Sequence, residues 1–233
     1  MRIEFRCLPG YAAHLPGPAP ATTALPDWLR TMPAEAASAV LGGAMVRTLK
    51  QCPPFIDAMR AGVLFPLATD LSVDGGELAW DWDLPRHPVG RQTRAPVGVH
   101  VPEQASGAPF ALPDSQFVVK FTNFWTIGLP EGWSMLFVHP LNRLDLPFRT
   151  LAGVVDCDRW RDGFVHFPAV WTDPDFTGTL PAGTPVAQGI PFPRNVLELD
   201  IAEMDEAGLA RHAALQDALQ AEPGLYRRDY RGE

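Results

Sequence analysis

The chain has 233 residues, of which 46% are hydrophobic and 20% are charged, and its formal net charge is −8. This length and composition favour a globular chain with a substantial core over a disordered or fibrous one, so we expect residues 1–233 to form a single domain. An acidic surface repels a phosphate backbone, which argues against a long nucleic acid as partner, whereas a few local arginines can still hold a small anionic molecule.

The cysteines and the lack of long apolar stretches indicate the compartment. The chain has three cysteines, Cys7, Cys52 and Cys157, and they are widely spaced. An odd number at such spacing is typical of a protein in a reducing compartment rather than of a disulfide framework. Residues 1–20 lack the apolar region of a signal peptide, and no stretch approaches the roughly 20 apolar residues that a membrane span needs. We therefore expect a cytoplasmic protein with no membrane partner.

Residues 1–116 are predicted to form an N-terminal extension with short helices and a β-hairpin. Pro53 and Pro54 suit the first turn of a helix, because the N–H groups that they lack would have no partner there, and Gly62 suits its end. The turn signal at 74–76 (DGG) precedes an alternating run at 77–82 (ELAWDW), which predicts a returning strand. Residues 85–115 have the composition of a loop.

Residues 117–194 contain the densest β pattern, and residues 200–222 contain the one long helical pattern. Short apolar runs separated by Gly, Pro and Asp predict strands at 117–121, 125–129, 133–139, 151–155, 163–167, 176–180 and 186–192. Such spacing is typical of a sandwich, a barrel or a β-clip. The sequence therefore predicts a mainly β core followed by a C-terminal α-helix.

Three segments within this core come in a characteristic order: 129–143 (LPEGWSMLFVHPLNR), 152–158 (AGVVDCD) and 180–190 (LPAGTPVAQGI). Their order and spacing resemble the dUTPase and dCTP deaminase superfamily over about residues 121–192, and the second segment is the most specific match. The resemblance implies a β-clip barrel core. The whole chain also resembles a family of bacterial and phage proteins that share its Trp-Thr-Ile, Pro-Leu-Asn-Arg and Gly-Thr-Pro segments, which implies no particular chemistry.

The resemblance implies roles for individual residues. Asp156 falls where dUTP-hydrolysing members carry the carboxylate that activates water, and Gln188 matches the glutamine of the third motif. Asn142 and Arg143 lie near the pair that contacts phosphate. Thr69-Asp70-Leu71 faintly echoes a motif that holds magnesium, which makes Asp70 a weak metal candidate and Mg²⁺ the cofactor implied for a nucleotide-acting protein. Members often form trimers with sites between subunits, so a homotrimer is implied as well.

The chain also departs from the superfamily pattern. The tyrosine that stacks on the base would fall at Arg159, and Trp160, one residue later, is the candidate replacement. The third motif lacks its charged turn, since Gly183-Thr184-Pro185 stands there, and no glycine-rich closing tail follows. For these reasons the resemblance supports the fold better than it supports the activity.

Other candidate residues have two interpretations each. Asp158 can form a carboxylate pair with Asp156, in which each shifts the pKa of the other, or both can hold a turn. Arg143 can bind a phosphate or pair internally with Asp145 or Asp156. His139 can line the same pocket, or it can be a structural histidine at the end of a strand.

We therefore expect the chain to bind or hydrolyse a small anionic ligand, such as a nucleotide, with Asp156 activating water in a (pyro)phosphohydrolase-like reaction. One alternative is a non-haem metal-dependent oxidative enzyme, in which His139, Asp156 and His166 hold iron. Another is a non-catalytic assembly module. The first hypothesis requires Asp156, Asn142 and Gln188 to meet around one hollow.

Overall fold

The computed structural model describes residues 1–88, 93–108, 118–222 and 224–231. It divides the chain into two compact units, Met1–Met32 with Asp57–Arg194, and Pro33–Ile56 with Asn195–Glu233. The single domain and the domain boundaries expected from the sequence stay predictions, and Phe117, where the first core strand was expected to begin, lies outside the described residues.

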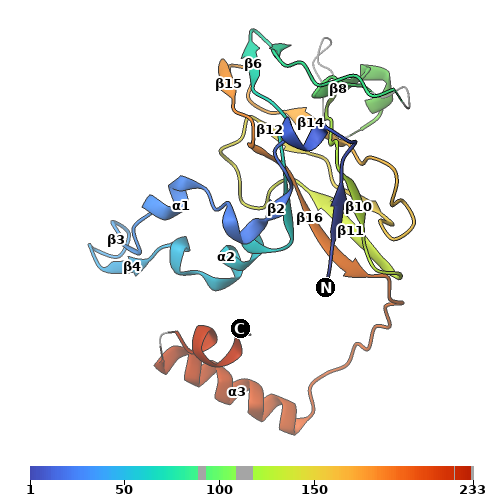
Figure 1. Ribbon diagram of the computed structural model, residues 1–233. Coiled ribbons are helices and arrows are strands. Elements are labelled where there is room, and N and C mark those ends of the chain that lie inside the picture. The colour runs from blue at the N-terminus through green and yellow to red at the C-terminus, as the bar shows by residue number, and fades with distance from the viewer. Residues whose placement is uncertain (89–92, 109–117, 223, 232–233) are drawn as a thin grey trace. The chain divides into compact units, whose positions relative to one another are not determined.

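The first unit is built from antiparallel sheets (Figure 1). One sheet has the order β13 (Gly153–Val155), β11 (Trp133–Val138), β16 (Pro185–Pro193), β5 (Val63–Pro66) and β2 (Ala19–Pro20). A second has the order β12 (Phe148–Thr150), β14 (Phe167–Trp171), β9 (Val118–Phe121) and β8 (Val97–His100). A third joins β15 (Gly178–Leu180), β6 (Leu71–Asp74) and β7 (Glu77–Ala79), and β1 (Glu4–Arg6) pairs with β10 (Thr126–Gly128).

Aromatic side chains from different sheets meet in the core of this unit. The ring centroids of Phe65 and Phe167 lie 5.1 Å apart, and those of Phe137 and Phe167 lie 5.4 Å apart. Phe121 and Phe148 of the second sheet are 4.7 Å apart. Each of these rings is almost fully buried, and tilted aromatic pairs at such distances stabilise a core beyond the area that they bury.

The short helices of the N-terminal region are α1 (Asp27–Thr31) and α2 (Pro53–Arg60). Gly62 follows α2 with φ of 68°, and a Cβ at this position would lie 2.0 Å from the carbonyl oxygen of Gly189 in β16. Only glycine allows both this conformation and this close approach of two backbones. Short 3-10 turns are found at Tyr11–Ala13, Ala21–Thr23, Leu49–Gln51 and Pro102–Ala105.

The second unit contains the hairpin of β3 (Glu35–Ala37) and β4 (Met45–Arg47), the helix α3 (Glu206–Ala221) and a π-helical turn at Tyr226–Tyr230. Asp205 caps α3, because its side chain accepts a hydrogen bond from Gly208 N. The mainly β fold with a C-terminal helix is thus confirmed. Within the described ranges no helix combines the length and apolarity needed to cross a membrane.

Candidate functional site

Asp156 directly follows β13 and lies beside the start of β11. The two strands pair with Val155 opposite Met135, which brings the side chain of Asp156 next to Ser134. The Ser134 hydroxyl donates a 2.6 Å hydrogen bond to Asp156 Oδ1, and Ser134 is completely buried. The Asp156 side chain is 42% exposed. One carboxylate oxygen is therefore held firmly while the group remains open to solvent.

Arg194, which directly follows β16, connects the groups around Asp156. Its guanidinium donates 3.0 Å hydrogen bonds to the carbonyl of Trp133 and to Ser134 Oγ, and it lies 3.2 Å from Asp156 Oδ1. It also forms a two-pronged ion pair with Asp158, with one of the two contacts at 2.8 Å. A planar fork of donors suits such a bidentate pair.

Asp158 is the most enclosed carboxylate of the cluster, with a side chain only 5% exposed. Besides the two contacts from Arg194, it accepts a 2.8 Å hydrogen bond from the backbone N–H of Gly132, which turns with φ of 80°. The hydrogen bonds from Arg194 hold the pKa of Asp158 well below its usual range, and Asp158 in turn raises the pKa of Arg194. Asp158 therefore fixes the 130–133 turn and Arg194 in place.

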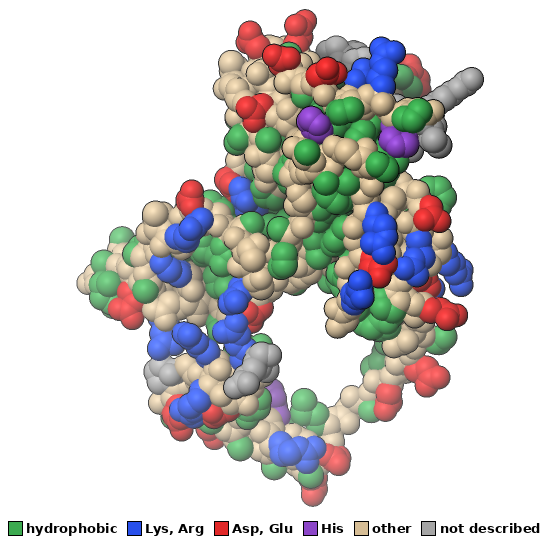
Figure 2. Space-filling view, in the orientation of Figure 1, with side chains coloured by type: hydrophobic (Ala, Val, Ile, Leu, Met, Phe, Trp, Pro, Cys, Tyr) green, Lys and Arg blue, Asp and Glu red, His purple; other side chains and the backbone are tan. Residues whose placement is uncertain are grey.

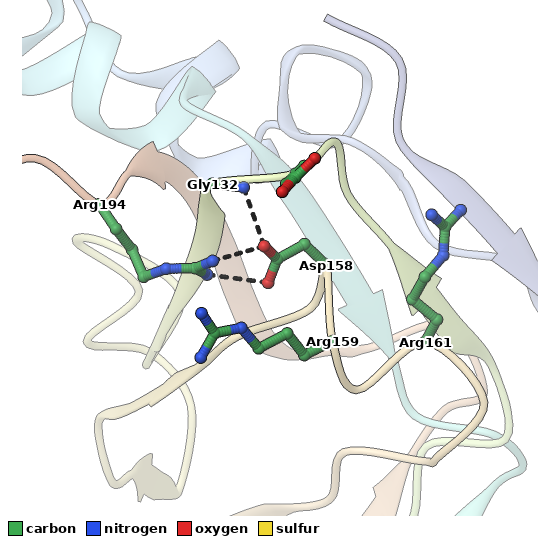
Figure 3. A pocket seen from close by; sticks show the side chains of 6 residues that line it. Gly132, Asp158, Arg159, Arg161 and Arg194 are labelled. Atoms are coloured by element: carbon green, nitrogen blue, oxygen red, sulfur yellow. Dashed lines mark hydrogen bonds and ion pairs between the residues drawn. The ribbon is translucent and has the colours of Figure 1, made fainter.

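A cavity of about 480 Å³ opens beside this cluster (Figure 3). It is lined by Glu131, Gly132, Asp158, Arg159, Arg161 and Arg194. The side chains of Arg159 and Arg161 are 76% and 50% exposed. In Figure 2, basic side chains gather on the surface over β10 and β11, near this cavity. This volume is within the range of small-molecule sites. The lining contains three guanidinium groups and two carboxylates.

The two outer arginines are only loosely paired. Arg159 Nη1 lies 3.8 Å from Asp156 Oδ2, and Arg161 Nη2 lies 3.5 Å from Glu4 Oε2. Surface ion pairs at such distances contribute little, so an incoming anion can replace them. Two backbone hydrogen bonds hold the 156–160 loop, because Arg159 N and Trp160 N both donate to the carbonyl of Asp156, at 2.9 and 2.8 Å.

Cys157 stands between the two aspartates but takes no part in the cavity. It is fully buried, and burial together with the charges of Asp156 and Asp158 raises the pKa of its thiol to about 11. Because the thiolate is the nucleophilic form, this cysteine is chemically inert in the folded protein.

Gln188 and Asn142 lie at the other end of β11. Gln188 pairs with Val138, whereas Asp156 adjoins Ser134. These positions are separated by most of the six-residue strand β11, which corresponds to about 13 Å along the strand. The strand register thus keeps Asp156 apart from Gln188 and Asn142 within one chain, and the shared hollow expected from the sequence does not form there.

Gln188 is 1% exposed, and backbone groups satisfy its amide. Its Oε1 accepts from Leu141 N at 2.8 Å, while Nε2 donates to the carbonyls of Ala58 and Ala61 at 3.0 and 2.6 Å. Both amide hydrogens are therefore used to join β16 to the end of α2. This geometry makes Gln188 a structural residue and does not support the ligand contact expected from the sequence.

Arg143 and His139 also form internal contacts. Arg143 pairs bidentately with Asp145, with Nε to Oδ1 at 2.9 Å and Nη2 to Oδ2 at 2.8 Å, which is the internal pair of the alternative interpretation. His139 Nδ1 accepts from Thr150 N at 3.3 Å and its Nε2 lies 2.8 Å from the Arg143 carbonyl. Burial lowers the pKa of His139. Asn142 adopts φ of 60° in the turn between them.

The other expected site residues lie outside the cavity. Trp160 is 55% exposed; its ring covers Gly163 and its Nε1 donates to the Phe164 carbonyl at 3.4 Å. Asp70 accepts a 2.7 Å hydrogen bond from Ala182 N, which ties two turns together. In the described part of the chain no three His, Cys, Asp or Glu side chains gather in a way that could hold a metal, so His139, Asp156 and His166 do not form the iron site of the alternative hypothesis.

Sequence reasoning missed five residues of the site, Ser134, Arg194, Arg159, Arg161 and Glu131. The signal for Ser134 is its place two residues after the glycine turn, on a strand that had to pair with the one ending in Asp156. Arg194 carries no comparable signal, because its partner Asp158 lies 36 residues away in the sequence.

Comparison with known proteins finds distant structural neighbours. No protein-family model matches the chain, and no curated protein matches it. Among solved structures, a mutant dUTPase from phage phi11 of S. aureus, described with a structural Mg(II) ion, has a TM-score of 0.28 at 13% identity, covering 47% of this chain and 98% of its own.

A second neighbour is a mutant dUTPase of Staphylococcus bacteriophage 80alpha with dUpNHpp, with a TM-score of 0.28 and 12% identity, covering 49% of this chain and 99% of its own. TM-scores of this size are too low to establish a common fold. The neighbours therefore add no residue assignment to the site described above.

Proposed function

We propose that the chain binds a nucleotide through its phosphate groups in the cavity beside Asp156, and that Asp156 activates water to hydrolyse the phosphate chain. The observation that carries this proposal is the pairing of a carboxylate held by Ser134 and Arg194 with two loosely paired arginines, Arg159 and Arg161, at a cavity of about 480 Å³. Arginine forks match phosphate oxygens in bidentate geometry.

In the proposed reaction Asp156 Oδ2 accepts a proton from a water molecule. The water oxygen attacks a phosphorus atom, and the bond from that phosphorus to the bridging oxygen breaks, so that the departing phosphate keeps the electron pair. Asp156 Oδ1 is fixed by the 2.6 Å bond from Ser134, whereas Oδ2 lies 3.8 Å from Arg159, a residue of the cavity lining. Arg159 and Arg161 would offset the negative charge that develops on the phosphate oxygens.

Magnesium is implied by the superfamily resemblance, but the residues of this chain do not fit a magnesium site. Asp70 is already bonded to Ala182 N, and no cluster of three suitable ligands is found among the described residues. We therefore expect any Mg²⁺ to arrive as part of a magnesium–nucleotide substrate, and no step above is assigned to it.

The resemblance also implies a trimer with sites between subunits. Within one chain Asn142 is kept at the far end of β11 from Asp156, so a second copy would be needed to bring the Asn142 turn to the cavity. For this reason the proposal includes a homotrimer as the form that binds nucleotide. Light scattering of the purified chain, with and without nucleotide, measures its oligomeric state.

The test is calorimetric titration with a panel of nucleoside mono- and triphosphates in magnesium, followed by measurement of pyrophosphate release. Arg159→Ala and Arg161→Ala are expected to weaken binding at least tenfold each, while Arg30→Ala, outside the cavity, serves as the matched control. Asp156→Asn is expected to abolish release and to preserve binding. The proposal fails if no nucleotide binds. If the unaltered chain binds a nucleotide but releases no pyrophosphate, the chain is a nucleotide-binding module without hydrolase activity.

A further inference from the structure

A second cavity, of about 640 Å³, lies between the β6–β7 hairpin and the sheet of β8, β9 and β14. It is larger than the cavity beside Asp156 and shares no lining residue with it. Sites for small molecules are usually concave, mostly apolar and furnished with a few polar groups, and this cavity has each of these properties.

The floor of the cavity is apolar because of the strand registers. Val73 pairs with Leu78 across the hairpin, and Val99 pairs with Val119 across β8 and β9. Directly opposed residues of antiparallel strands share one face, so these side chains line one side together. Val73 and Val119 are buried, whereas Val99 is 52% exposed. The floor is therefore continuous with the core and open at one side.

Two tryptophans form the walls. Trp171 is fixed, because its Nε1 donates to the Asp173 carbonyl at 2.7 Å and its ring packs against Phe148 and Phe176. Trp80 is 39% exposed, and its indole N–H has no hydrogen-bond partner among the residues that the structure describes. An indole face at the edge of an apolar cavity is a strong site for a cation.

Glu77 supplies the charge at the mouth. Among the described residues of the lining it is the only ionisable one, it is exposed, and it forms no ion pair with any of them. The neighbouring Gly75 and Gly76 leave the mouth open, since a Cβ at either position would meet nothing within 4 Å. The described lining thus combines a carboxylate, an indole and an apolar floor, and this combination favours a cationic ligand over an anionic one.

The geometry points to a binding site for a small organic amine with an apolar body. The body would rest on the valines between the two tryptophans, and the protonated amine would lie near Glu77 and the ring of Trp80. This site is independent of the nucleotide cavity, whose arginines select the opposite charge. The chain would then carry one site for anions and one for hydrophobic cations.

Three probes of similar size test the charge selectivity: 2-phenylethylamine, 2-phenylethanol and 3-phenylpropionate. Each is titrated into the full chain to millimolar concentration, with binding followed by calorimetry and by the indole N–H resonances. We expect the amine to bind most tightly, the alcohol more weakly and the carboxylate not at all. Absence of amine binding, or equal binding of all three probes, overturns the inference.

Two substitutions locate the site. Glu77→Gln is expected to reduce the preference for the amine over the alcohol about fivefold, whereas Asp74→Asn, on the same hairpin but outside the lining, leaves it unchanged. Trp80→Leu is expected to weaken binding of the amine at least threefold, while Trp160→Leu has no effect. Amine binding that survives both Glu77→Gln and Trp80→Leu unchanged contradicts the assignment.

Discussion

Ser134 and Asp156 lie on neighbouring strands that are joined by a 2.6 Å hydrogen bond from the serine hydroxyl to Asp156 Oδ1. The serine is fully buried and the aspartate is partly open, so the contact fixes a solvent-accessible carboxylate from inside the protein. Ser134→Ala is expected to cost about 1–2 kcal/mol in the free energy of unfolding, because it removes a bond to a charged acceptor.

Urea unfolding measures this loss, and Ser72→Ala, at an exposed position of β6, should change the stability much less. If Asp156 acts on bound nucleotide, Ser134→Ala should also lower kcat more than it raises KM. A variant with unchanged stability and turnover would show that Asp156 needs no such support.

Gln188→Leu is expected to destabilise the chain by about 3 kcal/mol, because it leaves the carbonyls of Ala58 and Ala61 and the N–H of Leu141 without their partner. Gln216→Leu, at an exposed position of α3, is the control in the same urea assay. Nucleotide affinity should stay the same in the folded fraction of Gln188→Leu. A large loss of affinity at full stability would restore Gln188 as a ligand residue.

His139 and His166 make stability depend on pH in the range just below neutrality. Burial lowers the pKa of both imidazoles, so the unfolded chain binds more protons than the folded chain as the pH falls through the unfolded value of about 6.5. Stability should therefore decrease from pH 7.5 to pH 5. Urea midpoints across this range measure the slope, which should be smaller in His166→Gln and unchanged in His14→Gln, since His14 is exposed.

Asp158 acts in a lower pH window. Its pKa is depressed in the folded chain, chiefly by the hydrogen bonds from Arg194, so its contribution is complete above the unfolded value of about 3.9 and is lost as the pH falls below it. Asp158→Asn should lower the urea midpoint at pH 7 and reduce the dependence on pH below 4. Asp162→Asn, at an exposed position, should change neither quantity.

The local features of the fold were predictable, and the long-range contacts of the site were not. The turn at Asp74–Glu77 and the helix starting at Pro53 follow from turn chemistry and proline geometry, which act over a few residues. The role of Gln188 depends on carbonyls 127 and 130 residues away. No periodicity or motif encodes such a contact, so resemblance alone made Gln188 look like a ligand residue.

The rate at which Cys157 is labelled reports how often the loop of the candidate site opens. A thiol that is fully buried between two carboxylates, with a pKa of about 11, reacts with a thiol reagent only when the surrounding loop opens. Cys7 and Cys52 are partly exposed and should be modified first. The rate of the slow phase of labelling would then measure how often the loop that carries Asp156 opens. A molecule bound beside that loop would make this phase slower.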